Sequence, residues 1–282
     1  MNYRHSFHAG NFADVMKHAL IVRILLHLAR KETPFRVVDT HAGIGRYDLA
    51  GPDAQRTREG EGGIERLGEP LAPDAEALLA PYRAVVAATR ARHGPTAYPG
   101  SPAIIREMLR RDDRAVFVEK HPEDAATLRE RFNAVRNIKV LHLDGWVALG
   151  SLVPPKERRG LVLVDPPYEE PHEGARAVAR MAHALGKWPT GIFALWYAVK
   201  QPAGADALAR DFARAVSKPA LRLELAIGAP ADSPRLGGSG MIVVNPPWTL
   251  ASEAETLLPA LAERLAVGVG AGCRIEPLGG GR

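Results

Sequence analysis

The sequence predicts a doubly wound α/β fold, with a mostly parallel sheet of about seven strands and an antiparallel edge. Short apolar segments alternate with helical segments from Ser101 onward, which is typical of such a sheet. Only a loop separates the apolar segments 221–227 and 240–244, so these two strands are expected to pair antiparallel. Of the 282 residues, 46% are hydrophobic, which is enough for one sizeable core.

The first predicted element is a helix over about 11–31, in which apolar residues recur at helical spacing. Asn11 can cap this helix, because its side-chain oxygen can accept a hydrogen bond from a free backbone amide of the first turn. A short apolar strand over 35–38 follows and ends at Asp39. A glycine-containing loop over 40–45 comes next.

Residues 46–98 interrupt the alternation of strands and helices. Glycine and proline punctuate the first half, one helix follows over about 74–92, and no strand is recognisable. We therefore expect a small helical insertion here. The main domain is then formed by residues 1–45 and 99–276, and residues 277–282 are expected to be a tail.

After the insertion, strands and helices alternate to near the end of the chain. Strands are expected at about 115–119, 138–142, 160–164, 190–197, 221–227 and 240–244. Helices are expected at about 102–111, 122–134, 146–153, 173–185, 206–216 and 253–265.

Composition narrows the class of protein without identifying it. The formal net charge of +5 permits a polyanionic partner but does not demonstrate one. No stretch approaches the roughly 18 apolar residues of a membrane span, and the opening residues lack the apolar core of a signal peptide. The single cysteine, Cys273, cannot form an internal disulfide. We expect a cytoplasmic, monomeric protein with no membrane partner.

Acidic residues follow four of the predicted strands: Asp39, Glu119, Asp144 and Asp165. The carboxyl ends of parallel strands meet at one edge of a sheet, where ligands bind. One such residue alone is more often a helix cap or a turn residue. Four of them along one edge favour a binding site.

The same edge suits a cofactor that contains adenosine. Glu119 can accept hydrogen bonds from both hydroxyls of a ribose, and Gly43 and Gly45 let the backbone approach a ligand closely. The loop lacks the glycine spacing of dinucleotide-binding and P-loop motifs. This pattern does not choose between NAD, ATP and S-adenosylmethionine.

The turn Asp165-Pro166-Pro167-Tyr168 discriminates between these possibilities. An exocyclic amine on a base is a poor nucleophile, because its lone pair is delocalised into the ring. The Asp165 side chain and the Pro166 carbonyl can each accept a hydrogen bond from one of its N–H groups. The two prolines fix the backbone of the turn. Tyr168 offers a stacking face for an unpaired base. The turn therefore indicates metal-free, in-line methyl transfer, although an ordinary Pro-Pro turn is the structural alternative.

A second turn, Asn245-Pro246-Pro247-Trp248, has the same chemical outline. It follows the last predicted strand and lies far from Glu119 and Asp144 in strand order. We therefore assign the catalytic role to Asp165. The second turn is expected to be structural or to wall the pocket for the target base.

Five of the ten histidines lie within the first 41 residues, among them His5, His8, His18 and His41. Their spacing fits no common zinc pattern and no cysteine accompanies them, so no metal is expected. An alternative is an entrance for cofactor and substrate, lined by Tyr3, Arg4, His5, Lys17, His18 and His41. Lys17 and His18 are then placed to meet the donor's carboxylate.

Several long motifs resemble one family. They are Tyr3–Asn11, Ala13–Val15, Lys17-His18, Asp39–Gly43, Tyr98–Pro102, Asp165–Tyr168, Ala194–Tyr197 and Ser239–Trp248. Together they resemble the bacterial 23S ribosomal RNA adenine-N6 methyltransferase J family over nearly the whole chain. The resemblance implies a Rossmann-like class I methyltransferase fold with a small helical insertion, of which 46–98 is the part least alike.

The resemblance also implies S-adenosylmethionine as the methyl donor and an adenine of unpaired or protein-free 23S ribosomal RNA as the substrate. It implies that the donor is bound by His18, His41, Ser101, Glu119, Asp144 and Gly145. Asp165 is implied as the catalytic residue and Tyr3 as an aromatic on the substrate side. With Lys17, Gly43 and Asp165, these residues form the expected cofactor site.

Two alternatives to ribosomal RNA methylation stay open. The chain could methylate adenine N6, or less readily cytosine N4, in DNA, because both bases carry an exocyclic amine. It could also be a non-catalytic RNA-binding protein on a methyltransferase fold. The intact series of acidic residues argues against the second alternative.

Overall fold

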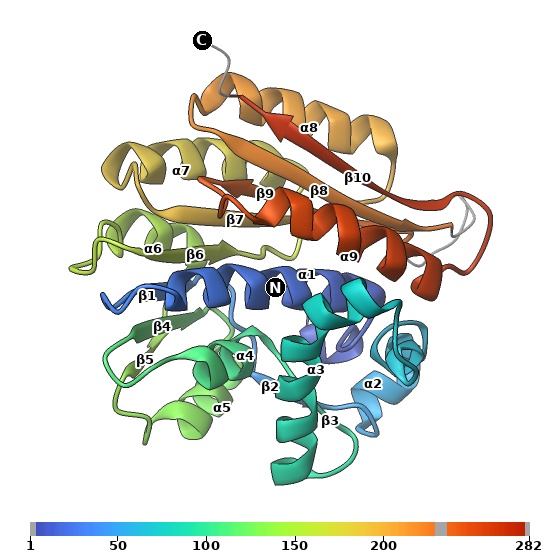
Figure 1. Cartoon of the computed structure of the whole chain (residues 1–282). Coiled ribbons are helices and arrows are strands. Elements are labelled where there is room, and N and C mark those ends of the chain that lie inside the picture. The colour runs from blue at the N-terminus through green and yellow to red at the C-terminus, as the bar shows by residue number, and fades with distance from the viewer. Residues whose placement is uncertain (1–3, 229–235, 280–282) are drawn as a thin grey trace.

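The computed structural model describes residues 4–228 and 236–279. Its centre is an eight-stranded sheet in the order β10-β8-β9-β7-β6-β1-β4-β5 (Figure 1). The strands are β1 (Arg36–Asp39), β4 (Arg114–Glu119), β5 (Ile138–His142), β6 (Gly160–Val164), β7 (Ile192–Val199), β8 (Ala220–Ile227), β9 (Gly238–Val244) and β10 (Ala271–Leu278). One strand more is present than the seven or so expected.

The sheet is parallel in one half and antiparallel in the other. β6, β1, β4 and β5 run parallel to one another, and β7 continues this direction beside β6. β9 is antiparallel to both β7 and β8, and β10 is antiparallel to β8. The predicted antiparallel pairing of the segments near 221–227 and 240–244 is therefore confirmed.

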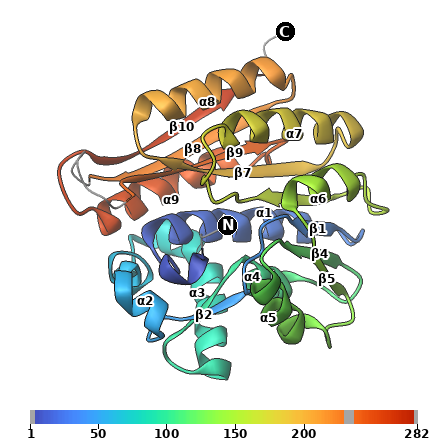
Figure 2. The same cartoon turned by 180° about the vertical axis from the view of Figure 1, so that it is seen from behind.

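Helices cover both faces of the sheet. They are α1 (Phe12–Ala29), α4 (Ser101–Met108), α5 (Pro122–Phe132), α6 (Gly145–Ser151), α7 (Glu173–Lys187), α8 (Pro202–Ala215) and α9 (Leu250–Leu265). α6, α7 and α8 lie side by side on one face (Figure 2), whereas α1, α4 and α9 pack on the other. Within the described ranges, no helix is both long enough and apolar enough to span a membrane.

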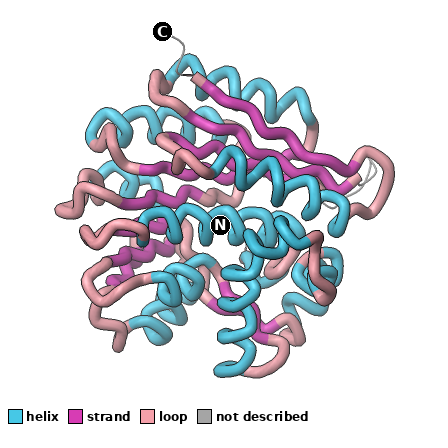
Figure 3. The backbone as a smooth tube through the Cα atoms, in the orientation of Figure 1, coloured by secondary structure: helices cyan, strands magenta, loops and turns pink. Residues whose placement is uncertain are grey.

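The segment after β1 is largely helical, as expected, but it also contains strands. Its elements are β2 (Arg46–Asp48), α2 (Pro52–Thr57), η2 (Glu59–Gly62), η3 (Ile64–Leu67), α3 (Pro73–His93) and β3 (Ala97–Pro99). β2 and β3 form a separate antiparallel ladder (Figure 3), in which Tyr47 faces Tyr98. The expectation of no strand was wrong, because strands of three residues are too short to show an alternating pattern.

The unexpected eighth strand, β10, also has a physical reason. It lies at the edge of the sheet, is only partly buried, and carries Arg274, Glu276 and Pro277 in place of an apolar run. Pro277 and Leu278 pair with β8 here, whereas we expected them in a tail. Residues 280–282 lie outside the described ranges.

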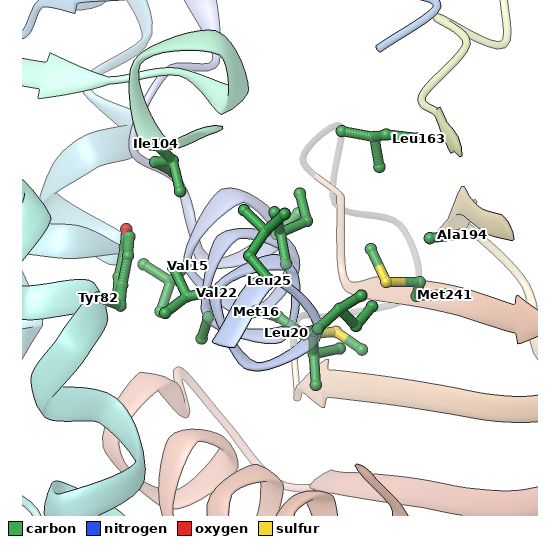
Figure 4. Close-up of a cluster of buried hydrophobic side chains, with 14 of the residues drawn as sticks. Val15, Met16, Leu20, Val22, Leu25, Tyr82, Ile104, Leu163, Ala194 and Met241 are labelled. Carbon is green, nitrogen blue, oxygen red and sulfur yellow. The ribbon is translucent and has the colours of Figure 1, made fainter. Parts of the chain in front are cut away.

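α1 is buried on nearly all sides because it lies between the sheet and the helices α3 and α4. Its amino end is capped as predicted, since the Asn11 side chain accepts a hydrogen bond from the amide of Asp14 at 2.9 Å. Figure 4 shows the buried cluster around the helix, formed by Val15, Met16, Leu20, Val22, Leu25, Tyr82, Ile104, Leu163, Ala194 and Met241. This packing fixes the polar residues of the first turns of α1 beside the end of β6.

Candidate active site

The carboxyl ends of the parallel strands surround a cavity of about 300 Å³. Its walls include all nine residues that we predicted for cofactor binding: Lys17, His18, His41, Gly43, Ser101, Glu119, Asp144, Gly145 and Asp165. We call it the acidic cavity, because its lining contains seven carboxylates but only three lysine or arginine side chains among the described residues. The carboxylates are Glu119, Asp124, Asp144, Asp165, Glu169, Glu170 and Glu173, and the basic residues are Lys17, Lys120 and Arg176. Such a lining favours a cationic ligand.

Glu119, the last residue of β4, is held by backbone amides. One carboxylate oxygen accepts a hydrogen bond from Gly43 at 2.8 Å, and the other accepts one from His121 at 2.7 Å. Burial raises the pKa of Glu119. Gly43 has a φ of +59°, and a Cβ there would lie 2.3 Å from the Tyr47 hydroxyl. The positive φ and the nearby Tyr47 hydroxyl therefore favour glycine at this position.

Asp144 serves both as a helix cap and as a cavity residue. Its Oδ1 accepts a hydrogen bond from the amide of Trp146 at the start of α6, and its Oδ2 lies 2.8 Å from Nζ of Lys120. Burial alone would raise the pKa of Asp144, but the hydrogen bonds from Lys120 and Trp146 lower it overall. Asp144 therefore presents a carboxylate at the cavity wall.

His41 is neutral and has a defined tautomer. The Thr40 hydroxyl donates to the carbonyl of Leu163 at 2.9 Å, so it accepts a hydrogen bond from Nδ1–H of His41 at 2.8 Å. Nε2 of His41 is then left as an acceptor. Burial lowers the pKa of His41 to about 4, which keeps the ring uncharged. A Cβ on Gly145 would lie only 2.7 Å from Nε2, so glycine leaves this face of the ring open.

Asp39 lies beneath the acidic cavity and reaches it through Ser101. The Ser101 hydroxyl donates to Oδ2 of Asp39 at 2.7 Å, and Asp39 is fully buried. Burial raises the pKa of Asp39 to about 7. Ser101 lines the cavity, whereas Asp39, which we placed in the same acidic series, does not.

Lys17 bridges two acidic residues. Its Nζ lies 2.6 Å from Oδ2 of Asp165 and 3.0 Å from Oδ1 of Asp14, and only 4% of its side chain is exposed. Burial would lower the pKa of Lys17, but Asp165 and Asp14 outweigh burial and raise it. We expected Lys17 to meet a ligand's carboxylate. In the structure its ammonium group engages the protein's own carboxylates.

His18 follows Lys17 and faces the aromatic residues of the insertion. Its Nδ1 lies 2.9 Å from the hydroxyl of Tyr98, which in turn lies 2.9 Å from the hydroxyl of Tyr82. Burial lowers the pKa of His18 to about 3, so the ring is neutral. The insertion therefore helps to hold one wall of the acidic cavity.

Asp165 lies where the acidic cavity meets a second one. The second cavity, of about 730 Å³, lies between the amino end of α1 and the ends of β7, β8 and β9. We call it the adjoining cavity. Asp165, Pro167, Lys17 and His5 line both cavities. A group held by Asp165 can therefore face ligands on two sides.

Pro166 and Tyr168, unlike Pro167, are not among the described residues that line either cavity. Pro166 is buried, and Tyr168 has a φ of +53°. The Tyr168 hydroxyl donates to the carbonyl of Trp196 at 3.0 Å. Tyr3, the other predicted aromatic, lies outside the described ranges.

Trp196, near the carboxyl end of β7, lines the adjoining cavity. Sequence reasoning gave it no role, although it lies within the motif Ala194–Tyr197. The sequence did hold a signal for it: Trp196 lies near the carboxyl end of the strand that follows Asp165 in the chain, so it could have been expected beside Asp165.

The turn that begins at Asn245 lies beside the amino ends of the parallel strands, on the side of the sheet away from Asp165. β9 is antiparallel to β7, so its carboxyl end lies beside the amino end of β7. Nδ2 of Asn245 donates to the carbonyls of Pro189 at 3.0 Å and Gly191 at 2.7 Å. The turn is therefore structural, as one of our two expectations stated. None of its residues is among the described residues that line the acidic cavity or the adjoining cavity.

The amino-terminal histidines each have a different partner. His5 lies 2.9 Å from Asp14, and His8 lies 3.0 Å from Glu59. In the part of the chain that the structure describes, no group of three or more His, Cys, Asp or Glu side chains is arranged to hold a metal ion. Of the residues expected at an entrance, His5 lines both cavities, whereas Arg4 pairs with Glu123.

Comparisons with known proteins identify relatives over nearly the whole chain. Residues 32–275 match the family model described as "Ribosomal RNA large subunit methyltransferase D, RlmJ". The chain is 39% identical over 265 residues to the ribosomal RNA large subunit methyltransferase J of Escherichia coli, and 37% identical over 268 residues to that of Haemophilus influenzae. Each alignment covers 94% of both chains. A crystal structure of a Legionella pneumophila protein is 31% identical, with a TM-score of 0.85 over 96% of this chain and 98% of that one.

Proposed function

This chain belongs to the ribosomal RNA large subunit methyltransferase J family, and we propose on that premise that it methylates the N6 amine of an adenine in 23S ribosomal RNA, with S-adenosylmethionine as donor. The observation that supports this most directly is the position of Asp165. Its carboxylate lies between a cavity lined by the residues expected for the donor and a second cavity open to a substrate. Methyl transfer needs the donor's methyl group and the target amine to lie next to each other, and a residue that lines both cavities can hold the amine at their junction.

The acidic cavity has the chemistry of a site for this donor. S-adenosylmethionine carries a methyl group that is already activated by a positively charged sulfur. The seven carboxylates of the cavity favour a cation, Glu119 offers acceptor oxygens for ribose hydroxyls, and Asp144 offers one for an adenine amine. The neutral Nε2 of His41 adds a further acceptor.

The chain's own contribution to the reaction is to orient the amine and to stabilise charge. The Asp165 carboxylate accepts a hydrogen bond from the target amine, which directs the nitrogen lone pair toward the acidic cavity. Positive charge develops on this nitrogen during transfer, and the carboxylate stabilises it. Lys17, fixed by Asp14, holds the Asp165 carboxylate in place at 2.6 Å.

Mass spectrometry of ribosomal RNA tests the proposal. In a strain that lacks the gene, 23S ribosomal RNA should lose one N6-methyladenine, and a plasmid with the wild-type gene should restore it. A plasmid with Asp165→Ala should not. An unchanged content of N6-methyladenine in the deletion strain would contradict the proposal, and transfer to DNA in preference to RNA, measured with both in one assay, would favour the DNA alternative.

The proposal also carries two expectations about the state of the protein. Ribosomal RNA is cytoplasmic in bacteria, so we place the chain in the cytoplasm. We further propose that it acts as a monomer. Light scattering of the purified protein, with and without RNA, tests the second point.

A further inference from the structure

We infer that Trp196 is the aromatic wall that contacts the target adenine, an inference that rests on the proposed function. Trp196 lines the adjoining cavity together with Asp165, Pro167 and Lys17. Among the described residues that line this cavity, it is the only tryptophan, tyrosine or phenylalanine. An unpaired base gains most of its sequence-tolerant binding from such a side chain.

The position of the indole follows from its neighbours. Nζ of Lys17 lies 5.5 Å from the centroid of the Trp196 ring and 2.6 Å from the carboxylate of Asp165. One ammonium group thus contacts both the ring and the catalytic carboxylate. A base whose amine is held by Asp165 must extend into the adjoining cavity, because the acidic cavity is required for the donor. The wall that it meets beside Asp165 includes Trp196.

The indole is also held rigidly. Its Nε1–H donates to the hydroxyl of Ser239 on β9 at 2.9 Å, and Trp196 lies in the paired region of β7 and β9. The rings of Tyr168 and Trp196 form a T-shaped contact, with centroids 5.9 Å apart. A wall fixed on two strands loses little conformational freedom when a base binds.

This arrangement changes the role that we assigned to Tyr168. The sequence suggested that Tyr168 stacks on the target base, but its hydroxyl donates to the Trp196 carbonyl and its ring packs against the indole. We therefore assign the contact with the base to Trp196 and a positioning role to Tyr168. A tryptophan that merely packs on the sheet would not respond to the presence of adenosine, and this difference can be measured.

The first experiment compares three variants: Trp196→Leu, Trp196→Phe and, as a matched control, Trp248→Leu. Trp248 is 76% exposed and belongs to the turn that begins at Asn245, away from Asp165. The substrate is protein-free 23S ribosomal RNA from the deletion strain. Trp196→Leu should lower kcat/KM for this RNA about 10- to 100-fold, mainly through KM, whereas Trp196→Phe should retain most of the activity. Affinity for S-adenosylhomocysteine, measured by calorimetry, should stay within about two-fold in all three variants.

The second experiment measures the indole itself. Adenosine is titrated into the protein saturated with S-adenosylhomocysteine, so that the donor site is filled, and tryptophan fluorescence is recorded. The wild type and the Trp248→Leu variant should show quenching by adenosine. The Trp196→Phe variant should not. This result decides the matter even where Trp196→Leu fails to fold.

Two results would overturn the inference: a Trp196→Leu variant that is folded and keeps kcat/KM within two-fold of the wild type, or quenching that persists in Trp196→Phe. Failure of the proposed function looks different. The wild type would then transfer no methyl group to 23S ribosomal RNA, and the fluorescence titration would still show whether adenosine reaches Trp196.

Discussion

Nζ of Lys17 lies 2.6 Å from Oδ2 of Asp165, although 148 positions separate the two residues in the sequence. This ion pair joins the first helix to the turn after β6, and Asp14 completes it from the same helix at 3.0 Å. The side chains of Lys17 and Asp14 are almost fully buried. Both the orientation of the Asp165 carboxylate and the attachment of α1 to the sheet depend on this contact.

Replacing Lys17 should therefore affect stability and activity together. Lys17→Met leaves two carboxylates without their cation in a buried site, and we expect a loss of about 3–5 kcal/mol in the free energy of unfolding. Urea denaturation measures this loss. The matched control is Lys120→Met, because Lys120 pairs with Asp144 but is 54% exposed, so its loss should stay within about 1 kcal/mol. Equal losses of stability in the two variants would contradict the prediction that the buried ion pair of Lys17 contributes more than the exposed one of Lys120.

The two Pro-Pro turns offer a direct comparison. Asp165→Ala should reduce methyl transfer by at least about 100-fold, because it removes the acceptor for the target amine. Affinity for the donor should change only a few-fold. Asn245→Ala should leave transfer unchanged and should cost about 1–2 kcal/mol in stability, because two hydrogen bonds to carbonyls are lost. Radiolabel transfer, calorimetry and thermal unfolding of both variants test the assignment, which would fail if Asn245→Ala were the inactive one.

Two glycines of α6 allow the effect of a steric contact to be compared with that of helix propensity alone. A Cβ on Gly145 would lie 2.3 Å from the Thr40 carbonyl and 2.7 Å from the His41 ring, so Gly145→Ala should weaken donor binding about 10-fold or more. A Cβ on Gly150 meets nothing within 4 Å. Gly150→Ala should therefore preserve donor affinity and stabilise the protein by about 0.5–1 kcal/mol. Calorimetry with S-adenosylhomocysteine distinguishes the two, and similar affinities would show that the loop and ring yield to the methyl group.

The pH dependence of stability should report on Asp39. Its pKa is raised from 3.8 to about 7 by burial, so the folded protein keeps this proton over a range in which the unfolded chain releases it. On this account the free energy of unfolding falls as the pH rises from about 4 to about 7. Asp39→Asn cannot release the proton, so its stability relative to the wild type should improve over this range by on the order of 1–4 kcal/mol.

The matched variant for this measurement is Asp144→Asn, which should behave in the opposite way. The pKa of Asp144 is lowered in the folded protein, so its carboxylate contributes stability above its ordinary pKa, and this contribution is lost as the pH falls. Asp144→Asn should therefore be less stable than the wild type at pH 7 and should approach it in acid. Urea denaturation at several pH values tests both, and the same sign for the two variants would refute the assignment.

Much of the acidic cavity could be predicted from the sequence, because its residues follow directly after recognisable strands. Glu119, Asp144 and Asp165 each follow an apolar run, and parallel strands bring such ends together. The family motifs then added residues with no such pattern, including Ser101 and His41. All of these line one cavity.

What could not be predicted depends on how elements cross in space. The ion pair of Lys17 with Asp165 requires α1 to lie over the end of β6. The helical spacing of apolar residues predicts the helix but not where it packs on the sheet. The roles of Trp196 and Asn245 depend on strand direction, since one lies near the carboxyl end of β7 and the other beside its amino end. Strand β10 lacks an apolar run altogether, because it is partly exposed and, among the described strands, pairs on one side only.

The position of the first residues has a practical consequence for work with the purified protein. His5 and His8, close to the start of the described chain, line the adjoining cavity, which we propose to receive the target base. An affinity tag at that end is expected to compete with the substrate and to depress measured activity. The other end of the chain follows β10, at the outer edge of the sheet. A tag placed there leaves the entrance clear, and the enzyme assays above are best carried out with that version.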